Sequence, residues 1–447
     1  MEATIKKGLY NRLIRLNPPQ ILAMGFFCLI IVGGMLLKLP FATKESISWV
    51  DAFFTATSAA TVTGLGVVDT ASTFTMFGQI VIMLLIQTGG LGLMTIAILI
   101  VWVLGKKIGL RHRLLIGEAF NQTNIGGLVK LVKRVFIFSI CIELIGVVFL
   151  SIRFIPEFGF GKGLYYSIFH VIAAYNNAGF ALWPDNLTRY VGDPIINIGI
   201  CSLIIIGGLG FTVLIDIWYS RSFQKLSLHS KIMIVGTVAL NVIAIIVIFL
   251  LEYNNAETLG PLSLNEKLWA SFFQGITPRT AGFNTVDYGG MEESSILFTM
   301  ILMFIGAGSV STGGGIKLTT FVILITSVVA FFRKKEDFVL FRRTIKMSTV
   351  TRALAIAVAS QILIFVAVFL LMLTDDFSFI QLLFETISAF GTVGLSMGIT
   401  AKLSAIGKCI IMFVMFCGLI GPLTLVFSLA RPAKQKIRYP SEDVFTG

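Results

Sequence analysis

The chain has 447 residues, of which 56% are hydrophobic and only 13% are charged, and its formal net charge is +12. About a quarter of the residues in a soluble domain are charged, so this composition excludes a water-soluble enzyme and a disordered chain. Apolar runs of about 20 residues, the length that crosses a bilayer as a helix, recur along the sequence. The composition therefore predicts a membrane protein with several spans.

Long apolar segments are the first predicted elements, because each approaches or exceeds the length that crosses the hydrocarbon core. We expect eight transmembrane helices, and an even number places both termini on the same side of the membrane. The segments are 21–37, 74–104, 135–152, 194–219, 232–251, 295–332, 353–373 and 404–430.

The basic residues are distributed unequally between the two sides. Of the 35 Lys and Arg residues, 25 lie in the two terminal segments and the three loops on the same side. Cytoplasmic loops carry an excess of Lys and Arg, so we expect both termini to be cytoplasmic. This orientation explains the net positive charge without a nucleic-acid partner.

A shorter apolar stretch, followed by a glycine-containing loop, lies between each odd-numbered span and the next. Such a stretch, about 12 residues long, can only enter the membrane and return, with its loop buried in protein or facing water. The loop glycines are Gly64, Gly179, Gly282 and Gly394, and a phenylalanine lies ten residues before each one, at Phe54, Phe169, Phe272 and Phe384.

These stretches predict four repeats of span, re-entrant half-helix, loop and span. The expected bounds are 1–105 with the N-terminal arm, 106–219, 220–332 and 333–447 with the C-terminal tail. A loop glycine permits a left-handed φ, and four such loops can turn their carbonyls toward one axis in place of a cation's hydration shell. The expected fold is therefore an all-α polytopic membrane protein with eight transmembrane helices around a pseudo-fourfold pore.

The longest apolar segment, 295–332, carries the sequence GAGSVSTGGGIK in its middle. Each glycine costs a helix roughly 1 kcal/mol relative to alanine, so we expect a break into helix, loop and helix. The break is expected on the cytoplasmic side of the four glycine-containing loops. Close helix packing through the glycines is the alternative, and Lys317 either blocks the pore electrostatically or extends toward the cytoplasm. The candidate gate residues are Gly306, Gly308, Gly313, Gly314, Gly315 and Lys317.

Ionisable residues at membrane depth are functional candidates. We expect Glu385 to support the filter from behind by hydrogen bonds. Asp216 either pairs with Arg221 or binds a cation in the inner vestibule, and Glu143 has no partner evident from the sequence. Arg279 is expected to face the outer mouth and to hold a loop through carboxylates.

The motifs TVTGL (61–65), NNAGF (176–180), TAGF (280–283) and TVGL (392–395) resemble the filter loops of the Trk/Ktr/HKT superfamily of potassium transporters. The resemblance covers essentially the whole chain and is greatest to the membrane subunits of bacterial Ktr systems. It implies a potassium-selective pore, homodimeric in the bacterial plasma membrane, on a cytoplasmic ring of nucleotide-binding RCK-type (KtrA-like) subunits. It also implies that sodium can stimulate uptake. Because the sequence has no glycine loop next to a strand-helix unit, we expect no nucleotide site on this chain.

By position, the resemblance assigns filter carbonyls to three residues of each loop and makes the 306–317 loop a gate. In this superfamily a serine at the first filter glycine accompanies sodium permeability, so Gly64 favours potassium. Several relatives carry an arginine in the last span where Leu419 stands, and a barrier role for that charge is not expected. The filter residues are Val62, Thr63, Gly64, Asn177, Ala178, Gly179, Thr280, Ala281, Gly282, Thr392, Val393 and Gly394.

Two functions stay open at this point, a gated potassium conduit and a sodium-coupled potassium symporter on the same fold. An intramembrane enzyme that uses Glu143, Asp216 or His170 is disfavoured, because these residues belong to different spans and have no nucleophile nearby. No catalytic or cofactor-binding residues are expected.

Overall fold

The computed structural model describes residues 18–92, 128–309, 311–335 and 337–421. Regular structure in this part of the chain is almost wholly helical, as the composition predicts. The exception is a short antiparallel hairpin made of β1 (Phe338–Leu340) and β2 (Arg343–Ile345). The short connecting helices are α4 (Thr70–Thr73), η1 (Thr188–Tyr190), η2 (Phe223–Lys225), η3 (Tyr288–Gly290) and η4 (Thr400–Lys402).

Among the described residues, four helices are long and apolar enough to cross a membrane, and each expected repeat contains one of them. A shorter helix follows each long helix and packs against it. The long helices are α2 (Pro18–Leu37), α8 (Leu128–Phe158), α12 (Leu228–Glu252) and α16 (Met347–Thr374), and the short ones are α3 (Trp49–Ala60), α9 (Phe160–Tyr175), α13 (Leu264–Ile276) and α17 (Phe379–Gly391).

Serine N-caps begin three of the four short helices. The side chain of Ser48 accepts a hydrogen bond from a backbone N–H in the first turn of α3. Ser263 with Glu266, and Ser378 with Gln381, form complete capping boxes at the starts of α13 and α17. These side chains satisfy N–H groups that an α-helix leaves without internal partners, so local sequence fixes where the short helices start.

A buried phenylalanine anchors each short helix in the core. Phe54, Phe169, Phe273 and Phe384 all have no exposed surface. In the third repeat Phe272 keeps the offset of ten residues from the loop glycine but is only partly buried, and its neighbour Phe273 is the buried anchor. The third repeat is therefore one residue shorter between its anchor and its loop glycine.

The second helix of each repeat stops inside the expected span. Gly92, Gly210 and Gly421 end three of these helices with φ of 82°, 99° and 87°. The expected uninterrupted span over 194–219 is wrong, because the chain bends by 91° between α10 and α11. The second helices are α5 (Met76–Leu91), α10 (Pro194–Leu209) with α11 (Phe211–Ser220), α14 (Glu293–Phe304) with α15 (Leu318–Phe332), and α18 (Ala405–Ile420).

The sixth predicted span behaves as its glycines indicate. The segment 305–317 separates α14 from α15, which confirms the expected break into helix, loop and helix. Residues 93–104 and 422–430 of two further expected spans, and the repeat boundary at 105, lie outside the described residues.

Close glycine contacts seat three of the second helices on the short helices. In each case the glycine lies three residues before the helix-ending glycine, and a side chain there would collide with a carbonyl at the end of the short helix. The pairs are Gly89 with Ala60, Gly207 with Tyr175, and Gly418 with Phe390.

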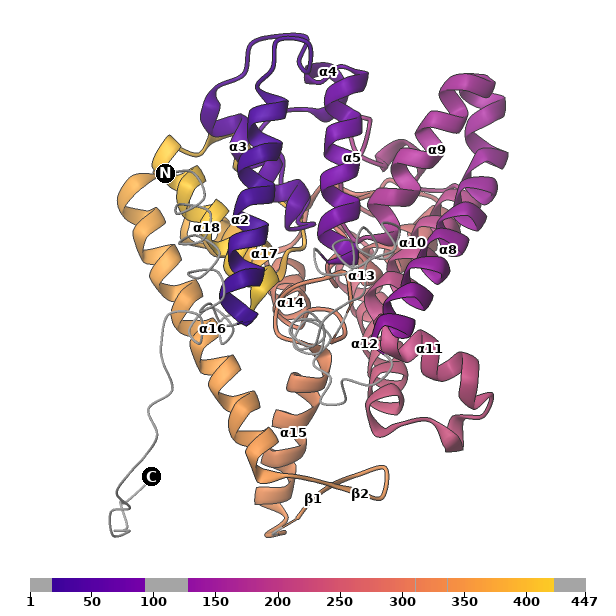
Figure 1. Cartoon of the computed structure of the whole chain (residues 1–447), viewed down its shortest axis with the longest axis vertical. Helices are drawn as coiled ribbons and strands as arrows, with labels where there is room; N and C mark the ends of the chain where they lie inside the picture. Colours follow the sequence, from indigo (N-terminus) through magenta and orange to yellow (C-terminus); the bar gives the residue numbers. More distant parts are fainter. Residues whose placement is uncertain (1–17, 93–127, 310, 336, 422–447) are drawn as a thin grey trace, which may run out of the picture.

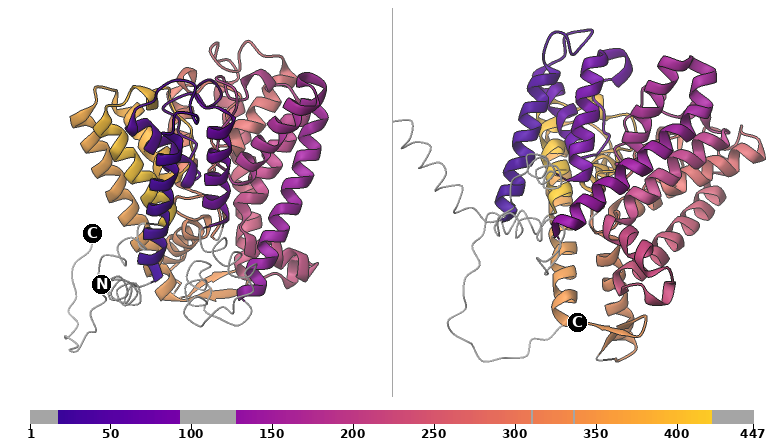
Figure 2. Two further views of the ribbon diagram at one scale, coloured as in Figure 1. Left: turned by 45° about the horizontal axis from the view of Figure 1, so that its top comes forward. Right: turned by 45° about the vertical axis from the view of Figure 1, so that its right-hand side comes forward.

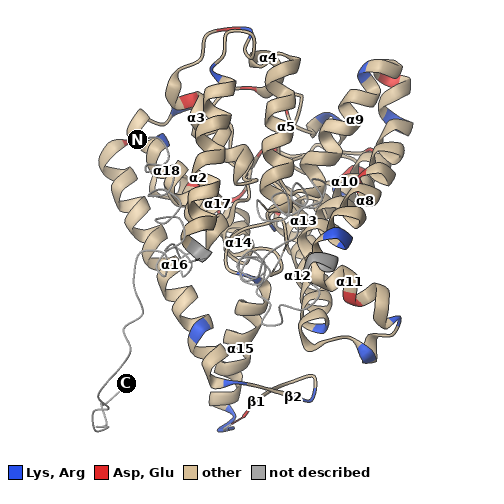
Figure 3. Cartoon of the chain, in the orientation of Figure 1, with Lys and Arg blue, Asp and Glu red and all other residues tan. Residues whose placement is uncertain are grey.

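Figure 1 shows α2, α3 and α5 packed together in one part of the molecule and α8, α9 and α10 in another. In Figure 1 and in the right-hand view of Figure 2, α15, α16 and the β1–β2 hairpin extend beyond the other helices at one end. Lys and Arg predominate over Asp and Glu around this end (Figure 3). This distribution agrees with the end that the charge count assigns to the cytoplasm.

Candidate ion-conduction site

The four loops that follow the short helices share one pattern of left-handed residues. In each loop, two residues separated by one position have a left-handed φ, and the second is the loop glycine. The first members are not glycines, and a β-branched residue in this region is strained. The pairs are Val62 and Gly64, Asn177 and Gly179, Thr280 and Gly282, and Thr392 and Gly394.

The loop glycines lie against one another in chain order and close a ring. A methyl group placed on Gly64 would lie 3.0 Å from the Cα of Gly179, and one on Gly179 would lie 2.8 Å from that of Gly282. One on Gly282 would lie 3.2 Å from the Cα of Gly394, and one on Gly394 would return to Gly64 at 3.0 Å. None of the four positions has room for a side chain.

Four backbone carbonyls lie next to the loop glycines, in the same order around the ring. Each loop glycine lies against the carbonyl oxygen that immediately precedes the glycine of the next loop, and the side chains of the other residues expected in the filter are fully buried. The backbone is therefore the part of these loops available to an ion. The four carbonyls belong to Thr63, Ala178, Ala281 and Val393.

Backbone hydrogen bonds explain how three of the loops fold alike and one differs. In the first, second and fourth loops, the amide before the glycine donates to a carbonyl five residues back, at 2.7 to 2.8 Å. In the third loop Ala281 N donates to Thr277 O, four residues back, at 3.0 Å. The residue missing from the third repeat is thus removed within this turn, and Gly282 still reaches the ring.

In repeats two to four, the polar residue that follows the anchor phenylalanine is hydrogen-bonded to the segment that leaves the loop. Leu182 N donates to His170 Nε2 at 3.3 Å, so the proton lies on Nδ1. Gln274 donates to Val286 O at 3.0 Å. These bonds give His170 a structural role and leave neither ring nitrogen free for a metal, since Nδ1 also bonds Tyr166 O.

Glu385 has the corresponding place in the fourth repeat. Its side chain is fully buried and accepts a hydrogen bond from Thr400 Oγ1, which also contacts Ser396 Oγ at 2.9 Å. Ser396 lies two residues beyond the loop glycine. Glu385 therefore contacts the segment that leaves the fourth loop, and its second carboxylate oxygen has no hydrogen-bond partner among the described residues.

The glycine-rich segment between α14 and α15 packs directly against two of the loops. Gly314 N donates to Thr392 Oγ1 at 2.8 Å. A side chain on Gly313 would collide with the side chain of Thr280, and Gly308 N donates to Gly208 O at 2.9 Å. The segment therefore joins the third and fourth loops to the end of α10.

Lys317 is held within the glycine-rich segment. Its ammonium group donates to the carbonyl of Gly313, four residues earlier. This bond closes the glycine-rich turn on itself. Leu419, at the position where an arginine was considered, is a partly buried residue that packs against the apolar core.

A cavity of about 540 Å³ lies against the loops and reaches Gly282 and Gly394. Asp185 and Asp287 also line it. Burial raises the pKa of Asp185, but hydrogen bonds from Arg189 and a neighbouring threonine lower it more, so its net pKa is below the usual value. The carboxylate stays charged at neutral pH, which favours cations in this cavity.

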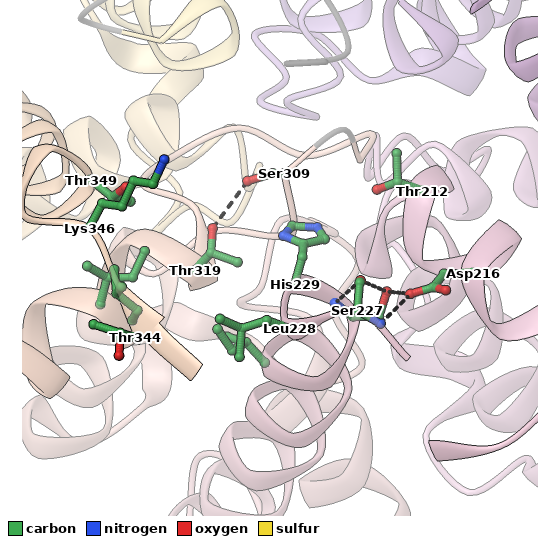
Figure 4. A pocket seen from close by; sticks show the side chains of 14 residues that line it. Thr212, Asp216, Ser227, Leu228, His229, Ser309, Thr319, Thr344, Lys346 and Thr349 are labelled. Atoms are coloured by element: carbon green, nitrogen blue, oxygen red, sulfur yellow. Dashed lines mark hydrogen bonds between the residues drawn. The ribbon is translucent and has the colours of Figure 1, made fainter. Parts of the chain in front are cut away.

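A second cavity, of about 750 Å³, lies between the glycine-rich segment and the β1–β2 hairpin (Figure 4). Asp216 lies at its edge and accepts hydrogen bonds from Ser220 Oγ at 2.9 Å, Ser227 N at 3.0 Å and Ser230 Oγ. The expected pairing with Arg221 is wrong, because these nearby donors already satisfy the carboxylate. Asp216 joins α11 to the start of α12.

The position expected for Arg279 is also wrong. Its side chain is only 6% exposed and points toward α12, where it donates to Asn241 Oδ1 at 3.1 Å and Thr237 Oγ1 at 3.4 Å. No carboxylate contacts it among the described residues, and its Nε has no hydrogen-bond partner. Arg279 ties the third loop to α12 from behind.

A polar group that sequence reasoning missed lies behind the second loop. Gln87 of α5 bonds both Glu143 of α8 and Asn176, which immediately precedes the loop. Gln87 is 56 residues from Glu143 in sequence, so no local pattern links them. The available signal was the glutamine itself, a polar residue within an apolar segment.

Apolar helices that surround a closed set of buried re-entrant loops define a membrane ion-transport protein, because backbone of this kind is tolerated in a membrane only around a polar path. The family model described as TrkH, cation transport protein, matches residues 20–438. The chain belongs to this family, which consists of transporters and not of enzymes.

Relatives match over nearly the whole chain. The Ktr system potassium uptake protein B of Bacillus subtilis is 56% identical over 444 residues, which are 99% of this chain and 100% of the relative. The potassium/sodium uptake protein NtpJ of Enterococcus hirae is 42% identical, over 97% of this chain and 98% of the relative. The crystal structure of the potassium transporter TrkH from Vibrio parahaemolyticus superposes with a TM-score of 0.70 at 18% identity, over 91% of this chain and 85% of that one.

Proposed function

We propose that this chain is the ion-translocating subunit of a Ktr-type potassium uptake system. The observation that carries the proposal is the closed order of loop contacts, in which each loop glycine lies against the carbonyl before the next. A ring of backbone carbonyls replaces the hydration shell of a potassium ion without a charged side chain. The name of the Bacillus subtilis relative supports potassium as the ion.

The proposed filter consists of three residues from each loop, within a pseudo-fourfold pore of eight membrane-crossing segments arranged as four repeats. The left-handed residues at the first and third positions of each triplet support this assignment, because alternating backbone handedness can direct successive carbonyls to one side. The negative C-terminal ends of the short helices favour a cation at the centre.

The proposed gate is the segment that contains Gly306, Gly308, Gly313, Gly314, Gly315 and Lys317. Its contacts with Thr280 and Thr392 support this role, because they attach the segment to the residues that begin two filter triplets. Opening would require the bond from Gly314 N to Thr392 Oγ1 to break. The cavity next to this segment offers space for such a movement.

The proposed assembly is a homodimer in the bacterial plasma membrane, with both termini cytoplasmic and a nucleotide-binding RCK-type ring on the cytoplasmic face. The Ktr system name of a relative indicates a system with more than one component. The basic end with the β1–β2 hairpin is the surface offered to that ring (Figure 3). Nucleotide control would then act through the partner and not through a site on this chain.

Sodium-coupled potassium symport is the second candidate function, favoured by the potassium/sodium name of the Enterococcus hirae relative. Sodium acting only as an activator is a different prediction, because activation does not require sodium to cross the membrane. Sodium flux distinguishes the two mechanisms.

The test is rubidium uptake into proteoliposomes that contain this chain, driven by a potassium gradient, with and without external sodium. We expect uptake that potassium inhibits and sodium does not. Labelled sodium entering in a fixed ratio with rubidium would favour the symporter. Equal inhibition of rubidium uptake by sodium and potassium would contradict a potassium-selective filter.

A further inference from the structure

Glu143 lies in the middle of α8 and is 8% exposed. A buried carboxylate at membrane depth is costly unless hydrogen bonds compensate the lost hydration. Its Oε1 accepts a hydrogen bond from Gln87 Nε2 of α5 at 2.8 Å. The residue therefore joins two helices at the level where α5 approaches its terminal glycine.

The contact continues from Gln87 to the second loop. Gln87 Oε1 accepts a hydrogen bond from Asn176 Nδ2 at 2.8 Å, and the same Nδ2 donates to Ile172 O at 2.9 Å. Asn176 immediately precedes Asn177, the first left-handed residue of that loop. The Glu143 carboxylate therefore reaches the residue before the second loop through the Gln87 amide, and the Asn176 side chain itself also interacts with the carboxylate.

The carboxylate determines the direction of every bond in this chain. Glu143 Oε1 accepts from the NH₂ group of Gln87, so Gln87 turns its oxygen toward Asn176. Asn176 must then direct its own NH₂ toward Gln87. Its Oδ1 is left without a hydrogen-bond partner and lies where a side chain on Gly90 would be.

We propose that Glu143 is the positioning residue of the second filter loop, which it orients through Gln87 and Asn176. The effect extends to the third loop, because the side chains of Asn177 and Thr280 are hydrogen-bonded at 3.0 Å. The proposal rests on the proposed potassium filter and adds a determinant of its selectivity. Glu143 itself contacts no ion.

A purely structural role predicts a different result from an orienting role. If Glu143 only filled space, glutamine of nearly the same shape would replace it without consequence. If it orients the amides, glutamine at 143 would let the chain of bonds run in either direction. Asn176 would then be free to turn, and the second loop would lose its fixed position.

The experiment is rubidium uptake by the full chain in proteoliposomes, with sodium and potassium as competitors. Glu143→Gln is expected to reduce the preference for potassium over sodium about five- to tenfold, as expected when a buried polar group loses a fixed partner, while rubidium still enters. Gly90→Ala disturbs the same Asn176 amide from the opposite side and is expected to give the same change. The same loss of potassium preference in both variants would show that it does not come from a folding defect of one of them.

A charge exchange provides the rescue. In the double variant Glu143→Gln with Gln87→Glu, the carboxylate at 87 accepts from the amide at 143 and from Asn176. Asn176 then regains its orientation, so we expect the potassium preference to return to within about twofold of the original, in the manner of a double-mutant cycle.

Matched controls are Glu157→Gln and Gly161→Ala. Glu157 lies on the same helix and pairs with Arg153 at 2.8 Å, whereas a side chain on Gly161 would meet no atom within 4 Å. Both are expected to keep the original preference. Unchanged selectivity in Glu143→Gln and Gly90→Ala, or no recovery in the double variant, would overturn the proposal. An original chain without potassium preference would instead refute the proposed function.

Discussion

The four loops form two neighbouring pairs that are supported in different ways. In the first and fourth loops, the amide of the loop glycine donates to a serine of its own short helix, at 3.0 Å from Gly64 to Ser58 and 3.1 Å from Gly394 to Ser388. Six residues before the glycine, the second loop has Ala173 and cannot make this bond. The second and third loops are instead joined by their own side chains.

Distant residues complete the support of that second pair. The second loop is tied through Gln87 to Glu143, and the third through Arg279 to Asn241 of α12. The comparison teaches that one backbone conformation can be specified locally or by tertiary contacts. Substitutions in the helices behind the ring should therefore affect the second pair more than the first.

The largest effect is expected for Gly179→Ser, at the point where the two second-pair loops meet. Its φ of 66° disfavours a side chain, and a Cβ there would lie 2.9 Å from Ala281 O. We expect the potassium preference to fall at least about 30-fold, which corresponds to about 2 kcal/mol. Rubidium uptake with sodium competition measures it, and unchanged selectivity at normal expression would contradict the ring.

Thr280→Val is expected to reduce the potassium preference about tenfold. The valine keeps the volume that packs against Gly313 but leaves the buried Asn177 side chain without this partner, at a cost of about 1–3 kcal/mol. Thr386→Val is the matched control, because Thr386 is equally buried and bonds only within its own helix, to Leu382 O. Equal selectivity of the two variants would show that the link between the loops is unimportant.

Thr392→Val tests the contact between the fourth loop and the proposed gate. It removes the acceptor of Gly314 N and leaves the bond from Gly394 N to Ser388 in place. Losing this bond should loosen the glycine-rich segment, so we expect rubidium flux without the regulatory ring to rise about fivefold at unchanged selectivity. A flux that stays at the original level in a folded variant would argue against the gate assignment.

The smallest effects are expected for Ser58→Ala and Ser388→Ala, which remove one local hydrogen bond each. A neutral hydrogen bond contributes about 1 kcal/mol or less, so the potassium preference should fall only about threefold in either variant. Rubidium uptake with sodium competition, measured for these two variants together with Thr280→Val, ranks their losses of potassium preference. If either serine variant lost more potassium preference than Thr280→Val, the first and fourth loops would depend on these local hydrogen bonds more than we expect.

Local sequence rules account for the repeats, the loop glycines and the interrupted 295–332 segment. The helix break at Gly210 could also have been predicted from the sequence, because GGLG occurs at 89–92 and again at 207–210, and both copies end a helix. The shared offset of ten residues points to Phe272, whereas the buried anchor is Phe273, because an alignment without gaps cannot register a one-residue shortening. That shortening lies in a hydrogen-bonded turn, which only coordinates reveal.

The remaining differences between the expected and the observed side-chain partners arise from tertiary contacts. Asp216 was matched with the nearest cation in sequence, whereas serines of its own helix end and the next helix reach it first. Arg279 was placed by its proximity to the loop glycine, but its side chain direction depends on the shortened turn. Glu143 gained a partner only because α5 and α8 come together in the fold.

The central claim is that four backbone carbonyls, those of Thr63, Ala178, Ala281 and Val393, bind a dehydrated potassium ion. Anomalous diffraction from crystals of the chain grown with thallium, a heavy potassium analogue, tests this most directly. The account predicts an anomalous peak on the axis between these oxygens that diminishes when potassium, but not sodium, is added in excess. Thallium bound elsewhere, with no peak between the four loops, would contradict it.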